Sequence, residues 1–195
     1  MQQRTTIAKR TIPSLARSPD AFAHAVLRTA KYQEMIDWYQ TVLNAEIGFR
    51  NDTLCFMTYD DEHHRVAIVN VPGLPPPDPA SARLAHLAYS YSDLGSLLST
   101  YRRLKQVGIV PYRPINHGPT VSFYYLDPDG TAIELQVDAF ATKEEAQRFM
   151  QSDAFRDNPI GVAIDPDALL AAYEAGIPEA DLKRRPTGPA APPQR

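Results

Sequence analysis

Residues 115–134, INHGPTVSFYYLDPDGTAIE, contain a histidine, two adjacent tyrosines, a tight-turn sequence and a carboxylate. Residues 121–126 are apolar and aromatic, as strands often are, and the Asp-Pro-Asp-Gly sequence at 127–130 is typical of a turn. Residues 131–137 have the composition of a second strand. The stretch therefore predicts a β-hairpin.

The turn also predicts which residues of the two strands face each other. Pro128 suits the first central position of a type I turn, and Gly130 suits the left-handed position that follows. Counting outward from this turn places Tyr124 opposite Glu134, and His117 lies a few residues upstream. These three polar groups are expected to reach one pocket. The hairpin alone leaves open the alternative that Glu134 faces solvent, as most charged residues do.

Length and composition are those of a globular protein with one domain or two small modules. The chain has 195 residues, of which 44% are hydrophobic and 22% charged, and a formal net charge of −3. It has no long basic run and no segment with the roughly 18 apolar residues of a membrane span. Its first residues lack the apolar core of a signal peptide, and the single Cys55 cannot form an internal disulfide. We expect a cytoplasmic protein that binds neither nucleic acid nor membrane.

The order of predicted elements repeats along the chain. Each half opens on an Ala-His pair, at 23–24 and at 85–86, and continues with an amphipathic helix and further strands. Duplication of a βαβββ module explains this repetition, so we predict an α+β fold in which two such modules form a curved mixed sheet. The predicted strands and helices are strands at 21–27, 53–59, 65–71 and 84–89, helices at 32–43 and 93–107, and the hairpin.

Composition also divides the chain into segments. Proline density excludes helix and inner strand from the linker, and a run of Pro, Gly and Ala predicts disorder at the end. The C-terminal extension has helical patterns at 143–150 and from Asp165-Pro166 to near Gly176, and we expect it to cover the site or a partner chain. The predicted segments are an N-terminal arm at 1–20, a first module at 21–73, a Pro-rich linker at 74–82, a second module at 83–140, a helical extension at 141–185 and a disordered tail at 186–195.

Two histidines and one glutamate occupy matching positions of the two modules, which suggests a metal site. Such a set covers one face of an octahedral ion, as in non-haem Fe(II) oxygenases. The chain here resembles the vicinal oxygen chelate (glyoxalase/bleomycin resistance/dioxygenase) superfamily, and within it the small one-domain type I extradiol ring-cleaving dioxygenases. The elements that carry the resemblance are Ile-Asn-His at 115–117, Phe-Tyr at 123–124, the Asp-Pro-Asp-Gly turn at 127–130 and Glu134.

The resemblance implies three metal ligands, His24, His86 and Glu134, on an Fe(II) ion, with Mn(II) as an alternative. Each histidine alone would be an ordinary core or surface residue, but all five of the chain fall within this scheme. Residues 66–70 contain no carboxylate, whereas a glyoxalase I-type site takes a fourth ligand at the corresponding place. Three ligands leave room for a catecholate and O2.

The resemblance further implies catalytic roles for His64, Tyr124 and His117. Tyr124 would hydrogen-bond the substrate, His117 would lie near its oxygens, and His64 would be the acid/base, although the adjacent His63 remains an alternative for that role. The implied reaction is cleavage of a catechol ring with O2 to a semialdehyde-type product, as in aromatic hydrocarbon catabolism. Two alternatives remain: a glyoxalase-like isomerase or lyase, and a metal-free binding or resistance protein. We expect a homo-oligomer, a dimer or higher.

Overall fold

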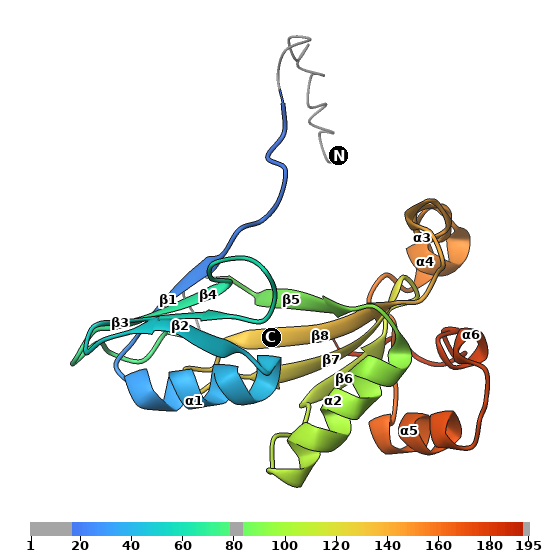
Figure 1. Ribbon diagram of the computed structural model, residues 1–195. Coiled ribbons are helices and arrows are strands. Elements are labelled where there is room, and N and C mark those ends of the chain that lie inside the picture. The colour runs from blue at the N-terminus through green and yellow to red at the C-terminus, as the bar shows by residue number, and fades with distance from the viewer. Residues whose placement is uncertain (1–16, 79–83, 193–195) are drawn as a thin grey trace.

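The computed structural model describes residues 17–78 and 84–192. Two β-sheets lie side by side, a long helix packs against each, and the shorter helices that follow the second sheet in the chain lie at its far side from the first sheet (Figure 1). This arrangement confirms the predicted α+β fold of two βαβββ modules. In chain order the elements are β1 (Ala25–Thr29), α1 (Tyr32–Leu43), β2 (Glu46–Arg50), β3 (Leu54–Thr58), β4 (Val66–Asn70), β5 (His86–Tyr91), α2 (Leu94–Gln106), β6 (Arg113–Asn116), β7 (Thr120–Leu126), β8 (Ala132–Asp138), α3 (Lys143–Met150), α4 (Asp153–Asp157), β9 (Val162–Ala163), α5 (Pro166–Glu174) and α6 (Glu179–Leu182).

The two sheets have the same strand order, as a duplication requires. The first is β1-β4-β3-β2 and the second is β5-β8-β7-β6, extended by β9 at its edge. In each, the opening strand runs parallel to the closing strand of its module and the other pairs are antiparallel. Because β9 comes from the C-terminal extension, that extension is an integral part of the second sheet.

The hairpin of β7 and β8 has the predicted register. Tyr124 lies directly opposite Glu134, and Gly130 has a left-handed φ of 78°. The N–H of Gly130 donates to the carbonyl of Asp127 at 2.8 Å, while the Asp127 carboxylate accepts the N–H groups of Asp129 and Thr131. Side-chain and main-chain bonds of the turn thus both stabilise the pairing that brings tyrosine and glutamate together.

Three predicted features differ in the structure. The strand predicted at 21–27 begins only at Ala25. The carbonyls of Phe22 and Ala23 accept hydrogen bonds from Arg65 instead of from a neighbouring strand. Strand β2 was not predicted. Its residues are all exposed and its pairing with β3 has a bulge, so its sequence lacks the alternation of buried and exposed residues by which a strand is recognised. Residues 186–192 of the predicted disordered tail are placed, with Ala191 buried and bonded to Gly161. The predicted arm and linker lie partly outside the described residues.

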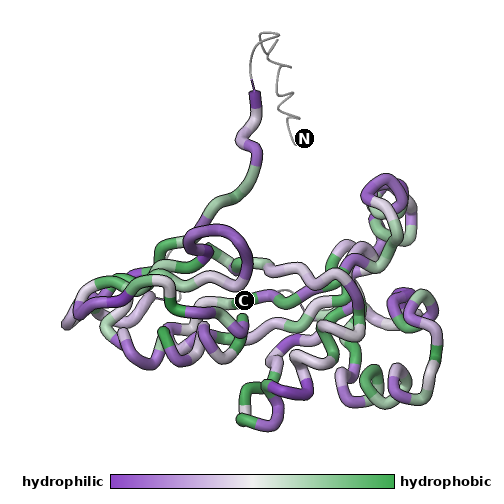
Figure 2. The backbone as a smooth tube through the Cα atoms, viewed as in Figure 1, coloured by the Kyte–Doolittle hydropathy of each residue, from purple (hydrophilic) through white to green (hydrophobic). Residues whose placement is uncertain are grey.

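One hydrophobic core joins the two modules. Hydrophobic residues recur along the strands of both sheets, and hydrophilic residues are frequent in the connecting loops (Figure 2). Helices α1 and α2 each contribute five side chains to this core. Among the described residues, no helix is long and apolar enough to cross a membrane.

A buried hydrogen bond between the modules yields a stability prediction. The Tyr39 hydroxyl on α1 donates to Asp127 Oδ2 in the hairpin turn at 3.1 Å, and burial raises the pKa of this carboxyl. Tyr39→Phe should lower the free energy of unfolding by about 1.5 kcal/mol, measured by urea denaturation, because a buried acceptor loses a donor. Tyr32→Phe is the matched control on the same helix, since its hydroxyl bond to Asn51 is exposed and should contribute less. Equal losses for both variants would contradict the prediction.

Candidate active site

The centre of the candidate site is a contact between His86 and Glu134. His86 is the first residue of β5, which runs parallel to β8, the strand that carries Glu134. Nε2 of His86 is 3.1 Å from Oε2 of Glu134, and Glu134 is only 5% exposed. A carboxylate in such a place needs a charged or hydrogen-bonding partner, so the alternative of a solvent-facing Glu134 is wrong.

Tyr124 and His117 lie beside this pair. Nε2 of His117 is 3.0 Å from the Tyr124 hydroxyl, and the Tyr124 ring meets the His86 ring edge-on with centroids 5.5 Å apart. Burial, and secondarily the charge of Glu134, raises the pKa of Tyr124. Burial also lowers the pKa of His117. The phenol is therefore held as a neutral donor and the imidazole is favoured in its neutral form.

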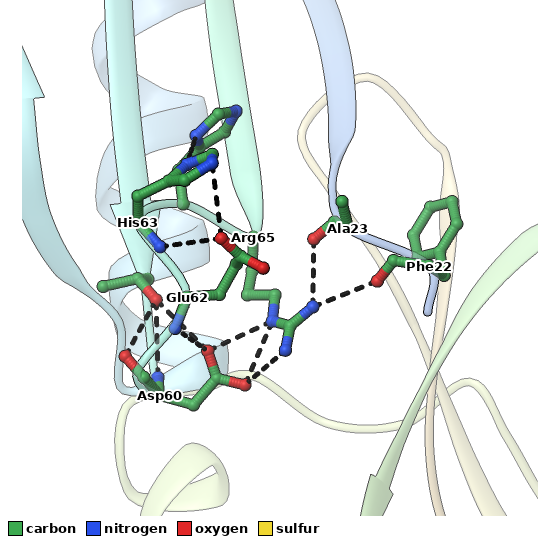
Figure 3. Close-up of polar contacts among 8 residues, drawn as sticks. Phe22, Ala23, Asp60, Glu62, His63 and Arg65 are labelled. Carbon is green, nitrogen blue, oxygen red and sulfur yellow. Dashed lines mark hydrogen bonds and ion pairs between the residues drawn. The ribbon is translucent and has the colours of Figure 1, made fainter. Parts of the chain in front are cut away.

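The other three histidines form a separate group at the start of the first sheet. The rings of His24 and His64 lie 4.2 Å apart, and the His64 ring stacks on Phe56 at 4.3 Å. Burial, and then the charges of the neighbouring histidines, lowers the pKa of His64. The side chain of His63 is 71% accessible, and it pairs with Glu62 (Figure 3).

Arg65 fixes the main chain immediately before His24. Its guanidinium donates to the carbonyls of Phe22 and Ala23, both at 3.0 Å, and binds the carboxylate of Asp60 (Figure 3). A small cavity of about 60 Å³ is lined by Phe22 and Ala23 on one side and by 87–89 of β5 on the other. The segment that leads into His24 is thus adjacent to the strand that begins with His86.

The structure brings together some of the predicted site residues. His86, Glu134, Tyr124 and His117 form one cluster, whereas His24 contacts His64 in the other. Within residues 17–78 and 84–192, no three His, Cys, Asp or Glu side chains are gathered closely enough to hold a metal ion. The three-ligand set therefore stays a prediction, with two of its members in contact.

Two contributors to the site were not predicted. The main-chain carbonyl of Ile160 lies 2.5 Å from Nδ1 of His117, and the Arg113 guanidinium lies over the Tyr124 ring, 5.2 Å from its centroid. Every residue has a main-chain carbonyl, so a contact made by that group does not require a particular amino acid. No sequence signal could therefore have identified Ile160. Arg113 is the residue across from Tyr124 on β6, and a predicted β6–β7 register would have found it.

Comparison with known proteins gives a family match and two similar curated proteins. The model of the Glyoxalase/Bleomycin resistance protein/Dioxygenase superfamily matches residues 21–135. Biphenyl-2,3-diol 1,2-dioxygenase 2 of Rhodococcus globerulus is 47% identical over 80% of this chain and 83% of its own length. Biphenyl-2,3-diol 1,2-dioxygenase 3 of the same organism is 45% identical over 84% and 87%.

A solved structure supports the fold independently of close sequence identity. A glyoxalase/dioxygenase from Nostoc punctiforme superimposes with a TM-score of 0.54 at 20% identity, covering 63% of this chain and 96% of that one. The share of this chain that is covered agrees with the extent of the two modules. The family match ends at residue 135, before the C-terminal extension that supplies Ile160.

Proposed function

We propose that this chain, which belongs to the Glyoxalase/Bleomycin resistance protein/Dioxygenase superfamily and is an extradiol ring-cleaving dioxygenase, opens a catechol-type ring with O2 at an Fe(II) ion. The observation that supports this most strongly is the contact of His86 with the buried Glu134, which lies opposite Tyr124 on the hairpin. The substrate class is an aromatic 1,2-diol such as biphenyl-2,3-diol, the diol named in both Rhodococcus relatives.

The donor groups present fit a non-haem iron site. An imidazole nitrogen and the oxygen of a buried carboxylate lie 3.1 Å apart, which suits a divalent ion that takes N and O ligands. His24 is the proposed third ligand, because the segment before it adjoins β5. His24, His86 and Glu134 would hold the ion, and Mn(II) is an alternative occupant. When bound, Fe(II) supplies Lewis acidity toward the diol oxygens and redox activity toward O2.

The remaining residues act on the substrate and its protons. Tyr124 has a raised pKa, so it keeps its proton and can donate a hydrogen bond to a developing oxyanion. His117 lies beside that hydroxyl, near the proposed position of the substrate oxygens. His64 is the proposed acid/base, which accepts a diol proton and returns one later.

The proposed reaction needs no external reductant. One ring carbon–carbon bond next to the diol breaks. One atom of O2 enters a carboxylate and the other enters a carbonyl group, which is an aldehyde where the cleaved ring carbon carries hydrogen and a ketone where it carries a substituent, as at the 1,2-bond of biphenyl-2,3-diol. The electrons that reduce O2 come from the diol itself. A homo-oligomeric state and a cytoplasmic location remain predictions.

A direct assay tests this function. The full chain is loaded with Fe(II) without air and mixed with a panel of 1,2-diols, including catechol and biphenyl-2,3-diol, and then with air-saturated buffer. We expect uptake of one O2 per ring and a yellow ring-opened product. Resorcinol, a 1,3-diol that cannot bind one ion through both oxygens, is the control and should give neither signal. Absence of O2 uptake with every 1,2-diol by iron-loaded protein would refute the proposal.

A further inference from the structure

Both ring nitrogens of His117 have fixed partners. Nδ1 lies 2.5 Å from the main-chain carbonyl oxygen of Ile160, and Nε2 lies 3.0 Å from the Tyr124 hydroxyl. A carbonyl oxygen can only accept a hydrogen bond, so Nδ1 must carry the hydrogen. In the neutral ring Nε2 is then an acceptor, and the phenol must be the donor.

The phenolic proton of Tyr124 has a second acceptor within reach. Glu134 lies directly across the strand pair and is within hydrogen-bonding reach of the same hydroxyl. The two acceptors compete for this proton, because good alignment of the O–H with one of them weakens the hydrogen bond to the other. Which of them receives it depends on whether His117 offers a lone pair or a hydrogen at Nε2.

The Ile160 carbonyl belongs to a hydrogen-bonded turn of the C-terminal extension. Oδ1 of Asn158 accepts the N–H of Gly161 at 2.8 Å, and Nδ2 of Asn158 donates back to the carbonyl of Gly161 at 3.1 Å. Arg185 donates to the carbonyl of Asn158 at 2.9 Å. Immediately after the turn, β9 pairs with β6, the strand that leads into His117.

Gly161 lets this turn approach the main chain of His117 closely. Its φ is +99°, in the left-handed region. A Cβ at this position would collide with the carbonyl of Asn116 and lie only 2.6 Å from Cα of His117. Both obstacles are main chain and cannot rotate away, so any side chain at 161 must push the turn off His117.

We propose that the C-terminal extension belongs to the active-site machinery: the Ile160 carbonyl is a positioning group that fixes His117 as the Nδ1–H tautomer. In the substrate-free site this tautomer directs the Tyr124 proton to His117, and a bound diol oxygen then replaces Nε2 as the acceptor of that proton. The Glu134 carboxylate is thereby left available as a ligand. This last consequence rests on the proposed function, whereas the tautomer does not. The role is one of positioning, because Ile160 acts through His117.

The tautomer can be read directly by NMR of the full chain labelled with ¹⁵N-histidine. Long-range ¹H–¹⁵N correlation distinguishes protonated from unprotonated ring nitrogens, and His117→Gln assigns the signals. The chain is measured after chelation of any bound metal, so the readout does not depend on turnover. We expect protonated Nδ1 and unprotonated Nε2 for His117. An Nε2–H tautomer in the unmodified chain would overturn the inference.

Gly161→Ala should shift His117 toward the Nε2–H form and lower kcat about tenfold with KM little changed. Gly176→Ala is the matched control, because Gly176 also lies in the extension with a φ of +83°, but a Cβ added there would meet no atom of a non-adjacent residue within 4 Å. It should leave the tautomer and kcat unchanged. If Gly161→Ala does not fold, Asn158→Ala is used instead, because it removes both side-chain hydrogen bonds of the turn. The protonation of the His117 ring nitrogens, measured by the same NMR experiment, then tests the role of the turn.

The outcomes separate this inference from the proposed function. A folded Gly161→Ala or Asn158→Ala chain that keeps the Nδ1–H signal of the unmodified chain would refute the role of the turn. An unmodified chain with the expected tautomer, a shifted tautomer in the variants and no activity on any 1,2-diol would contradict the proposed reaction while supporting the positioning role.

Discussion

Glu134→Ala is expected to abolish stoichiometric Fe(II) binding and to lower kcat/KM at least about 100-fold, the upper range for loss of a group that supports a metal site. The variant removes the one anionic donor of the proposed ligand set and leaves His86 without its 3.1 Å partner. Metal content after equilibration with Fe(II) and gel filtration gives the first measurement, and O2 uptake gives the second. Because Fe(II) binding needs the Glu134 carboxylate and O2 uptake needs the bound Fe(II), iron content and O2 uptake should fall together.

The control for this variant lies two residues along the same strand. Gln136 is on the same face of β8 as Glu134, and its amide donates to the Ser90 hydroxyl at 2.9 Å. Gln136→Ala should therefore keep its iron and most of its activity. Glu134→Ala protein that is folded by circular dichroism and still holds one equivalent of iron would exclude Glu134 as a ligand.

The parts of the fold that were predicted correctly are those encoded by local chemistry. The Asp-Pro-Asp-Gly sequence determines the length and type of the turn, and the turn determines the strand register that places Tyr124 opposite Glu134. Helices α2 and α5 begin where they were predicted to begin, directly after Asp93 and Asp165, whose carboxylates cap them by accepting main-chain N–H groups. Such signals are contained within a few residues and need no knowledge of tertiary contacts.

The features that were missed depend on contacts between distant segments. Arg65 reaches the carbonyls before His24, more than 40 positions away in the chain, and so delays the start of β1. His117 and Ile160 are separated by 43 positions and meet through a main-chain atom. Neither contact imposes a residue type that a single sequence would reveal.

The comparisons confirm the predicted family and the extradiol dioxygenase class. The matched curated relatives, at 47% and 45% identity, are dioxygenases and neither isomerases nor resistance proteins. The alternatives of a glyoxalase-like isomerase and of a metal-free binding protein lose support accordingly. The identity of the metal is still a proposal, and the clustering of His86 with Glu134 is the structural feature on which it depends.

His64→Phe should leave iron binding intact and lower kcat by about 10²- to 10⁴-fold, the usual contribution of a positioned general acid–base group. The substitution preserves an aromatic ring that can stack on Phe56, as His64 does at 4.3 Å, so the fold should persist. It removes the His64 imidazole, which can take up and return a proton, and replaces it with a phenyl ring, which cannot. Iron content measured beside steady-state O2 uptake separates loss of turnover from loss of metal.

His63→Phe is the matched control, because it makes the same chemical change at the adjacent position. The His63 side chain is largely exposed and pairs with Glu62, whereas His64 lies against both Phe56 and the proposed ligand His24. The control should therefore retain kcat within about threefold, since surface substitutions away from special contacts have small effects. If His63→Phe loses turnover and His64→Phe retains it, the acid/base role belongs to His63. Full activity in both variants would place the proton transfer on neither residue.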